Sequence, residues 1–582
     1  HAKLHVITYL DWQREGSQTF DRQRAHLLDI LSYLMQNMPA SSQPTQAVPR
    51  QFLFSTQTVV LSDIAELRAK LLASLVIYNA GERLDIGPWY VEVDGLLTGG
   101  EALVRNLLLA RVDTQEHGIK LAQIVFALHS QQNAAQLPQI LQNFGIKSVI
   151  FGLHNPKMLL PFIWQALDGS RVLVTIASVN NTAEEAIATQ REWQPDGPFL
   201  WLNHFSNPQT APILHDQVEL PVEQSRLEQY IQDIQASLPS KFRPTVSGEL
   251  HLTNERTFWG RLSARRDLKQ RLAQLEADLL HYAEPLQAVA LTHGKLPFPK
   301  NQRVLLDFSW RLLLQNQAWY TTAGAISDAV HEEIHIRFRR ISDTNQVVIT
   351  NAIDALDGLR QTVLPSTVPA TSESYQTSLV VWNLQDMAVK QVVELTLAVL
   401  EDFYPAVLVA PSGQEQTFHW DATRKKIGFL ADAPPVGYVV YRLTLSRDKT
   451  AAYNQARQVD GSVIGSASSA SLGISEDALE WRFGDHHIPN LLTYHDGGDD
   501  GDVWHYQEPR SDLVVQANLV DTPQVEATPT YERLNFRNRM RIAPRLTDGV
   551  RYRGLRVLDI SSQATYYNNV PGVYFSAQFT NN

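Results

Sequence analysis

Four polar residues stand where short apolar runs of the N-terminal region end: Asp11, Asp94, His129 and His204. The runs read as β-strands, and in open α/β sheets and barrels ligands bind beyond the carboxyl ends of the strands. Carboxylate and imidazole groups at such a place can bind a metal ion or transfer protons. The sequence therefore predicts a candidate site at these strand ends.

The first strand end lies in the stretch "LHVITYLDWQREGSQ", residues 4–18. An apolar run changes sharply to polar residues and is followed by an amphipathic helical pattern, which is typical of a metal-binding strand end. The tip, Asp11-Trp12-Gln13, is nevertheless a poor place for a metal ion. Two alternatives stay open at this point: a zinc site with unusual ligands, or a site that has lost its zinc.

The elements that would position this site alternate between β-type and helical patterns over the first ~240 residues. This alternation predicts an α/β domain at residues 1–245. In its first helical pattern Leu27, Leu28, Leu31 and Leu34 lie on one face. The strand candidates are KLHVITYL (3–10), QFLFST (51–56), LDIGPWYVEV (84–93), IVFALH (124–129), SVIFGL (148–153), RVLVTIA (171–177) and PFLWLNH (198–204).

After about residue 250 the spacing of apolar residues along the sequence changes. Apolar residues at three- and four-residue steps predict a three-helix bundle domain at residues 250–360. Alternating patterns then predict a small β-sandwich at 372–448 and a further β-sandwich domain at 449–582. Because the chain starts and stops inside strand patterns, the last β-domain is expected to be incomplete. The expected fold class is multidomain: α/β, helical bundle, then β-sandwich modules.

Composition narrows the classes of partner. The 582 residues carry a formal net charge of −11 and a pI near 5.9, which disfavours nucleic acid and anionic membranes as partners. No cysteine is present, so disulfides and thiolate–zinc sites are excluded. No apolar run reaches the ~20 residues of a membrane span, and no leader pattern is visible, so a cytoplasmic protein is expected. A homo-oligomer stays an open alternative.

Six stretches, in order along the chain, resemble glycoside hydrolase family 38, the zinc-dependent retaining α-mannosidases, in its bacterial branch. The resemblance covers nearly the whole chain, and it implies a seven-stranded α/β domain of this family's type. The stretches are DIGPWYVEVDGLLTGGEALVRNLL (85–108), AAQLPQILQNFGI (134–146), FIWQALDGSRVLV (162–174), LKQRLAQLEADLLHYAEPL (268–286), SDAVHEEIHIRF (327–338) and LLTYHDGGDDGD (491–502).

The resemblance also implies roles for individual residues. Asp94 stands at the position of the nucleophile, and His129 stands at the position of the acid and base. A retaining mechanism places two such groups ~5–5.5 Å apart. The family's zinc-ligand positions are Asp11, Gln13, Asp94 and Trp319. The resemblance further suggests sugar contacts at Trp12, Trp89, Tyr320 and Ser206.

Several of these positions depart from the family pattern. The family has His and Asp where this sequence has Asp11 and Gln13, and His where it has Trp319. A neutral amide is a weak ligand, and an indole cannot bind zinc at all. The residue after the nucleophile is Gly95, where the family usually has a polar one. The sequence therefore predicts that zinc is absent or weakly bound.

Each of these interpretations has a simpler alternative. Asp94 is either a nucleophile or a strand-end carboxylate left in a cleft, and His129 is either an acid or a solvent-facing loop residue. Asp11 and Asp94 together could hold Ca²⁺ or Mg²⁺ through oxygen ligands. The aromatic residues could line a cleft suited to a sugar, or they could pack in the core. They are Trp12, Trp89, Tyr90, Trp201, Trp319 and Tyr320.

Three hypotheses about function follow. The first is a hydrolase of α-mannosides or a close variant such as mannosylglycerate, in which Asp94 attacks and His129 is acid and base. The second is a pseudoenzyme that keeps the cleft as a sugar- or partner-binding surface. The third is the product of a decaying gene. Because the metal and acid positions are replaced, we expect an α-mannosidase by family with weak or absent activity.

Overall fold

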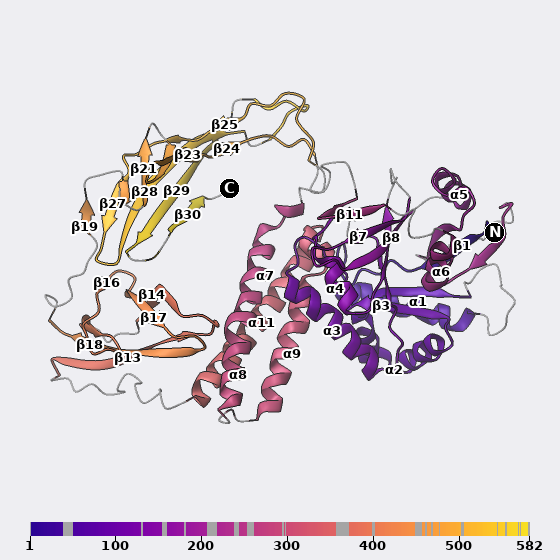
Figure 1. Ribbon diagram of the computed structural model, residues 1–582, viewed down its shortest axis with the longest axis horizontal. Helices are drawn as coiled ribbons and strands as arrows, with labels where there is room; N and C mark the ends of the chain where they lie inside the picture. Colours follow the sequence, from indigo (N-terminus) through magenta and orange to yellow (C-terminus); the bar gives the residue numbers. More distant parts are fainter. Residues whose placement is uncertain are drawn as a thin grey trace. The chain divides into compact units, whose positions relative to one another are not determined.

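In the computed structural model the chain folds into two compact units (Figure 1). Unit 1 comprises His1–Leu279, Lys300–Gln346 and Asp502–Tyr506, and unit 2 comprises Leu280–Pro299, Val347–Gly501 and Gln507–Asn582. The helical stretch expected at 250–360 is therefore shared between both units. The structure describes residues 2–38, 50–129, 132–153, 160–179, 182–205, 218–237, 244–252, 261–293, 296, 298–356, 372–397, 402–448, 457–459, 463–466, 470–475, 478–501, 506–543, 545–552, 554, 556–568, 570 and 572–579.

All seven strands predicted for the N-terminal region are present in unit 1. They are β1 (Leu4–Tyr9), β2 (Phe52–Gln57), β3 (Leu84–Trp89), β4 (Ile124–Ala127), β6 (Ser148–Leu153), β8 (Arg171–Ser178) and β9 (Phe199–His204). Every residue of β1, β3, β4 and β6 is buried, as expected for parallel strands covered on both faces. The predicted α/β architecture is confirmed.

Each of these strands belongs to one of two five-stranded sheets. In the first, β1 pairs in parallel with β9, β2 and β10 (Val222–Gln224), and β2 pairs in parallel with β3. The second has the order β11 (Thr245–Ser247), β7 (Phe162–Gln165), β8, β6 and β4, with only β7 and β8 antiparallel. A short antiparallel pair joins β5 (Gln132–Asn133) to β12 (Leu250–His251). Parallel pairing places the residues after β1, β3 and β9 at one edge of the first sheet.

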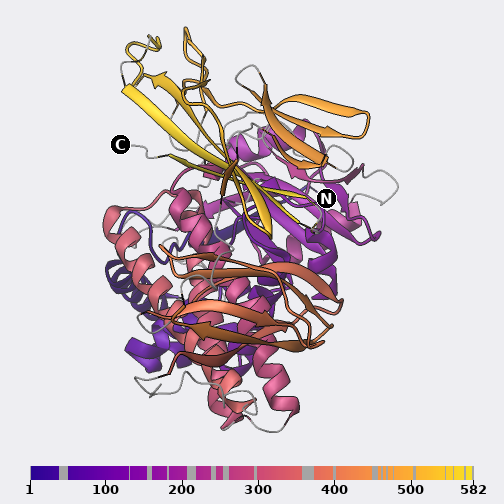
Figure 2. The same ribbon diagram turned by 90° about the vertical axis from the view of Figure 1, so that its left-hand side faces the viewer.

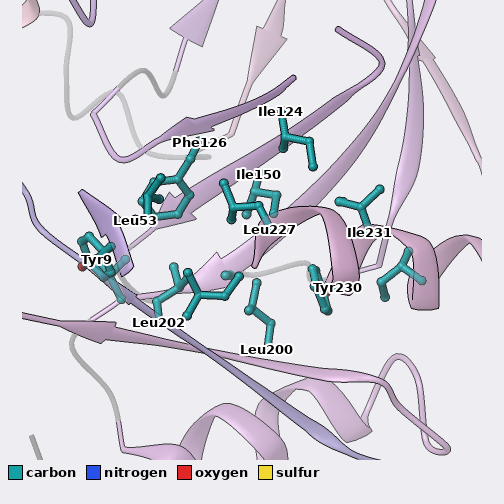
Figure 3. Close-up of a cluster of buried hydrophobic side chains, with 14 of the residues drawn as sticks. Tyr9, Leu53, Ile124, Phe126, Ile150, Leu200, Leu202, Leu227, Tyr230 and Ile231 are labelled. Carbon is teal, nitrogen blue, oxygen red and sulfur yellow. The ribbon is translucent and has the colours of Figure 1, made fainter. Parts of the chain in front are cut away.

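A single buried cluster joins the two sheets (Figure 3). Its side chains come from both sheets and from helix α6 (Leu227–Ser237). Figure 3 shows Tyr9, Leu53 and Phe126 gathered at one end of the cluster, and Tyr230 and Ile231 of α6 at the other. Burying each large apolar side chain stabilises the fold by about 1.5–3 kcal/mol. This shared core fixes the strand ends relative to one another.

Five further helices accompany these sheets: α1 (Phe20–Asn37), α2 (Val59–Ala80), α3 (Gly100–Glu116), α4 (Leu137–Asn143) and α5 (Ala183–Arg191). The apolar face predicted for α1 is largely confirmed, since Leu27, Leu31 and Leu34 are buried and Leu28 is half-buried. Helix α5 begins with a capping box, in which Thr182 and Glu185 satisfy each other's backbone N–H groups.

The helical segment consists of α7 (Arg266–Asp278), a π-helical turn (Leu279–Ala283), α8 (Glu284–Thr292), α9 (Pro299–Asn316), α10 (Trp319–Ala323) and α11 (Asp328–Ala355). Gly324 ends α10 with φ +80°, a left-handed conformation that glycine adopts without steric cost. This stop lets the chain turn between α10 and α11. None of the described helices is both long enough and apolar enough to span a bilayer.

Unit 2 contains the predicted small β-sandwich. One sheet has the order β13 (Ser374–Asn383), β18 (Gly437–Ser446), β15 (Tyr404–Val409), and the other β14 (Val389–Thr396), β17 (Lys426–Ala433), β16 (Phe418–Asp421). All pairs are antiparallel. Trp420, Phe429 and Leu443 lie in the core formed by the two sheets.

The remaining part of unit 2 is also built of antiparallel strands (Figure 2, orange to yellow). Its longest pair is β28 with β29, and β20 to β23 form a four-stranded meander. Nδ1 of His419 in the sandwich lies 2.5 Å from Oγ1 of Thr530, and this hydrogen bond links the two β-parts of the unit. The strands are β19 (Arg457–Val459), β20 (Val463–Ser466), β21 (Ala470–Ser475), β22 (Ala478–Phe483), β23 (His486–Leu492), β24 (His495–Asp496), β25 (Val515–Gln516), β26 (Asn518–Leu519), β27 (Gln524–Ala527), β28 (Tyr531–Ile542), β29 (Arg556–Tyr567) and β30 (Val573–Phe579).

Candidate active site at the strand ends

Three of the predicted site residues form one cluster in unit 1: Asp11, His129 and Trp319. Nε2 of His129 lies 3.2 and 3.3 Å from the two carboxylate oxygens of Asp11. The imidazole is stacked on the Trp319 ring, with centroids 3.9 Å apart and planes 14° from parallel. The side chains of Asp11 and His129 are 26% and 21% exposed. Both side chains of this pair are therefore in contact with solvent.

The contact changes the protonation of both partners. Burial alone would lower the pKa of His129, but the hydrogen bond and the charge of Asp11 outweigh burial and raise it. Burial alone would likewise raise the pKa of Asp11, yet its contact with His129 lowers that pKa overall. The ion pair between imidazolium and carboxylate is therefore the favoured state over a wider pH range than for the free groups.

Backbone contacts hold this cluster beside strand β3. The Trp319 N–H donates to the Glu92 carbonyl at 2.9 Å, and Ala318 forms an antiparallel bridge with Val93. The Glu92 side chain accepts hydrogen bonds from the N–H groups of Leu128 and His129 at 3.2 and 3.3 Å. Burial raises the pKa of Glu92. Glu92 is buried, and its hydrogen bonds hold the backbone of Trp319 on one side of the cluster and of Leu128 and His129 on the other.

Asp94, at the nucleophile position, is paired with the buried cation Arg261. Arg261 Nε lies 2.6 Å from Asp94 Oδ2, and its Nη2 lies 3.3 Å from Oδ1. The N–H groups of Leu96 and Leu97 also donate to Oδ1, at 2.9 and 3.1 Å. Asp94 and Arg261 are only 6% and 5% exposed. Both carboxylate oxygens of Asp94 are therefore engaged by the protein itself.

A further contact fixes Arg261, whose Nη1 donates to Gln132 Oε1 at 3.0 Å on the short strand β5. Next to it Gly95 forms a bridge with Asn133. A Cβ atom on Gly95 would collide with the Asn133 side chain and would lie 3.1 Å from its Cα. Glycine at this position lets β5 approach Asp94, which explains why a polar residue is not found there.

Two buried ion pairs hold the loop that follows β1. Arg14 contacts Asp63 of α2 through its Nε and Nη2, at 3.0 and 3.2 Å. Glu15, which is fully buried, accepts from both Nη groups of Arg337 on α11, and the Nη1 distance is 3.0 Å. The position of Asp11 and Gln13 thus depends on charged side chains that point into the protein.

The predicted sugar contacts lie mainly in the core. Trp12, Trp89 and Tyr320 are 4%, 4% and 1% exposed, so their rings pack inside the protein in this conformation. Of the six aromatic residues considered for a cleft, Trp319 is the one that stays half-buried. The Ser206 prediction lies outside the described residues. Gln13 is half-buried, and its Oε1 lies against Gly16.

His204 also belongs to this edge of the sheet. It is exposed and stacks on Tyr9 with ring centroids 5.2 Å apart. Partial desolvation by the neighbouring side chains lowers the pKa of His204, and the nearby charge of Asp11 opposes that change only in part. The strand ends of β1, β4 and β9 thus place Asp11, His129 and His204 close to one another, as their position in the sequence predicted.

Arg261, Glu92 and Lys269 are residues of this region that sequence reasoning missed. Arg261 lies in a segment rich in arginine, so nothing in the local pattern marks it as the buried partner of Asp94. Lys269 lies near Asp94 and Arg261, and burial lowers its pKa to about 8. For Glu92 the strand pattern "WYVEVD" does contain a signal, because a charged residue inside a buried strand needs partners.

The residues at the four family zinc positions do not fit the ion. Arg261 places a guanidinium against Asp94, where a metal would need a free carboxylate. His129 occupies the carboxylate of Asp11, and Trp319 offers an indole that cannot be a ligand. Gln13 contributes a neutral amide oxygen, and a single amide oxygen does not hold zinc.

A small cavity of ≈ 20 Å³ is lined by the residues on either side of Asp94 in the sequence, Val93 and Gly95, among others. Its lining includes Glu92, Gly95, Asn133 and Phe151. The volume is about that of one water molecule, so it is too small for a sugar ring.

Comparison with known proteins identifies the class of the N-terminal part. Residues 15–242 match the model of the glycosyl hydrolases family 38 N-terminal domain. The matched part of the chain, which contains Asp94 and His129, is similar to this family 38 domain. The resemblance found in the sequence motifs is thus confirmed.

Two relatives agree with this assignment. The chain is 28% identical over 386 residues to the "Putative mannosylglycerate hydrolase" of Halalkalibacterium halodurans, which covers 58% of this chain and 41% of that protein. It is 28% identical over 301 residues to "Alpha-mannosidase 2C1" of Homo sapiens, covering 47% of this chain and 28% of that protein. The aligned part thus spans less than half the length of either relative.

The fold agrees with that of solved structures. The structure of an α-mannosidase from Enterococcus faecalis V583 matches with a TM-score of 0.72 at 18% identity, covering 100% of this chain and 74% of that one. A family 38 protein from Enterococcus faecalis matches with a TM-score of 0.69, also at 18% identity. At this identity the likeness establishes the fold alone.

Proposed function

We propose that this chain is an α-mannosidase-type glycoside hydrolase fold that has lost zinc-dependent hydrolysis and keeps a binding site at its strand ends. The single observation that carries the proposal is the buried ion pair of Asp94 with Arg261. A nucleophile must present an unshielded carboxylate to the anomeric carbon. Asp94 instead gives both oxygens to Arg261 and to backbone N–H groups.

The acid position supports the same proposal. A retaining glycosidase uses its second group first as an acid and then as a base at the glycosidic oxygen. The Nε2 atom of His129 is engaged by Asp11 and its ring face is covered by Trp319. Proton transfer from Nε2 to a leaving group would require His129 to break its contact with Asp11.

Binding without hydrolysis remains compatible with the site. Asp11 and His129 offer hydrogen-bonding groups that are partly exposed, and Trp319 is a half-buried aromatic ring beside them. Carboxylates that accept from hydroxyls, next to an aromatic face, suit a sugar. An α-mannoside, or mannosylglycerate as named for the bacterial relative, is the ligand that the family assignment favours.

The test measures turnover and binding on one sample purified without chelator. Hydrolysis of p-nitrophenyl α-mannoside and of mannosylglycerate is followed with and without added Zn²⁺, beside the Enterococcus faecalis α-mannosidase as positive control. We expect no turnover above background in any condition. Turnover that the variant Asp94→Asn abolishes would contradict the proposal.

Binding is measured by calorimetry with the same two sugars. We expect heat of binding that the variant Trp319→Ala loses, while Trp481→Ala on strand β22 of unit 2 retains it. Absence of binding for the unchanged protein would remove the sugar-binding part of the proposal and would leave the loss of hydrolysis standing.

A further inference from the structure

A second group of potential metal ligands lies on the helices of unit 1, apart from the strand-end residues. It consists of Asp267 at the start of α7 and of His331 and His335 on α11. Among the residues that the structure describes, this is the one set of three or more His, Cys, Asp or Glu side chains whose ligand atoms gather within 4.8 Å.

The sequence spacing of the histidines fits a metal site. His331 and His335 are four residues apart on one helix, so their side chains lie on the same face. The stretch reads His-Glu-Glu-Ile-His, which has the His-Glu-x-x-His pattern of helices that bind zinc through both histidines. The pattern alone is short and frequent, and its meaning depends on a third ligand nearby.

Asp267 supplies that third ligand from a different helix. Its Oδ2 lies 2.8 Å from His331 Nε2 and 3.3 Å from His335 Nε2, and the two Nε2 atoms lie 3.3 Å apart. Ligand atoms held tetrahedrally by Zn²⁺ at 2.0–2.1 Å are about 3.3 Å from one another. The three atoms therefore already form a triangle of nearly the size that the ion requires.

The three side chains are partly open to solvent, so a water molecule can reach the cluster. The side chains of Asp267, His331 and His335 are 50%, 23% and 45% exposed. Phe338 packs edge-on against His335, which holds that ring in place. The neighbouring Asp328 is paired with Arg265 at 2.8 Å, so it does not compete for the histidines.

We propose that Asp267, His331 and His335 bind a divalent transition-metal ion of the Zn²⁺ class, with a water molecule as the fourth ligand. Two imidazoles and one carboxylate suit Zn²⁺, Co²⁺ or Ni²⁺ better than Ca²⁺ or Mg²⁺, which take oxygen ligands. The ion joins the start of α7 to α11. This site is distinct from the family zinc positions at Asp11 and Asp94.

The first experiment titrates ZnCl₂ and CoCl₂ into the full chain without a histidine tag, using calorimetry and the visible absorption of Co²⁺. We expect one ion per chain and a tetrahedral Co²⁺ spectrum. Each of the variants His331→Ala and His335→Ala should bind at least tenfold more weakly, since a lost ligand weakens binding more than the 10–100-fold effect of a lost supporting contact.

Two matched controls make this result specific. His487→Ala removes an exposed histidine whose carboxylate partner is Glu480 at 2.9 Å and which belongs to no set of three potential ligands among the described residues. It should leave zinc affinity unchanged. Asp11→Asn should also leave it unchanged, since Asp11 belongs to the strand-end cluster.

A second readout is thermal unfolding. Saturating Zn²⁺ should raise the melting temperature of the unchanged protein, because an ion that binds only the folded state stabilises it. The double variant His331→Ala/His335→Ala should show no such rise. Zinc binding that survives this double variant overturns the proposal. If Asp11→Asn abolishes the binding instead, the ion sits at the strand ends and the proposed loss of the family metal site is wrong.

Discussion

In the loop of residues 11–16, some side chains point into the protein and others lie at the strand end, partly exposed to solvent. Arg14 and Glu15, which agree with the family pattern, point inward and are held by buried partners on α2 and α11. Asp11 and Gln13, which depart from that pattern, are half-buried at the strand end. The side chains that position the loop are in place, whereas Asp11 and Gln13 stand where the family resemblance implies different metal ligands.

The pair of Asp94 and Arg261 gives a first prediction at this scale. Arg261→Met should destabilise unit 1 by about 3–5 kcal/mol, because it leaves a buried carboxylate without its partner. The double variant Asp94→Asn/Arg261→Met should be less destabilised than Arg261→Met alone. The introduced amide would be neutral, and its oxygen could still accept from the N–H groups of residues 96 and 97. Urea unfolding of the three proteins measures both effects.

An exposed ion pair serves as the control for this prediction. Arg105 and Glu101 lie four residues apart on α3, with side chains 30% and 45% exposed. Arg105→Met should cost no more than about 1 kcal/mol, since it removes this exposed ion pair and the contact of Arg105 with the Trp310 ring. If Arg261→Met costs equally little, the pairing of Asp94 does not stabilise the fold and the argument against its nucleophilic role fails.

The pair of Asp11 and His129 gives a second prediction, which concerns pH. The raised pKa of His129 means that its contribution to stability is fully present below about pH 6.5 and is lost as pH rises through the folded-state pKa. The lowered pKa of Asp11 means that its contribution is present above about pH 3.9 and is lost as pH falls through the folded-state value.

The pair should therefore stabilise the fold most between about pH 4 and pH 6.5. The difference in unfolding free energy between the unchanged protein and Asp11→Asn should be about 1 kcal/mol near pH 5.5 and smaller at pH 8.5. Urea unfolding at both pH values provides the comparison. A difference that grows toward pH 8.5 would mean that neutral His129 is the favoured partner of Asp11.

At the scale of elements, the loop after β1 is tied to α11 through Glu15 and Arg337. Glu15→Gln should destabilise unit 1 by about 3–5 kcal/mol, since it leaves the buried guanidinium of Arg337 without a counter-charge. Urea unfolding measures this loss, with Glu101→Gln on the exposed face of α3 as control. A loss as small as that of the control would show that packing, rather than the ion pair, holds the loop.

Elements with a strong apolar pattern were predictable, and short ones were not. The seven longer strands and the buried face of α1 follow directly from runs of apolar residues. Strands β5, β10, β11 and β12 have two or three residues each, too few for any period to be visible. Yet β5 carries Gln132, which helps to fix Arg261, so the detail of the site depends on an element without a sequence signal.

For the candidate site, the positions of residues at strand ends were predictable from the sequence, but the contacts between them were not. The sequence predicts that Asp11, Asp94, His129 and His204 stand at strand ends. In the structure His204 is the last residue of β9, and the other three lie two to five residues after β1, β3 and β4. The sequence does not predict that Arg261 reaches Asp94, because that contact joins residues 167 positions apart and depends on tertiary packing. The sequence also could not predict that Trp12, Trp89 and Tyr320 are buried, because an aromatic residue suits a core and a sugar cleft equally well.

At the scale of the whole molecule, the order of α/β, helical and β-rich parts is as predicted, while the pairing within them is not readable from sequence. The described strands of the α/β part form two five-stranded sheets and one two-stranded pair, and contact between distant segments decides which strands pair. The helical segment is divided between two compact units, although its period is continuous along the chain. The period of apolar residues predicts whether a segment is a helix or a strand, but it does not predict which helices and strands pack together in one unit.

The central claim is that Asp94 serves the fold and no longer the reaction. The most direct measurement is the rate of p-nitrophenyl α-mannoside hydrolysis by the unchanged protein and by Asp94→Asn, both supplied with Zn²⁺. The account predicts that neither protein exceeds the rate of the buffer. A rate above that of the buffer that disappears in Asp94→Asn, with the variant still folded, would contradict it.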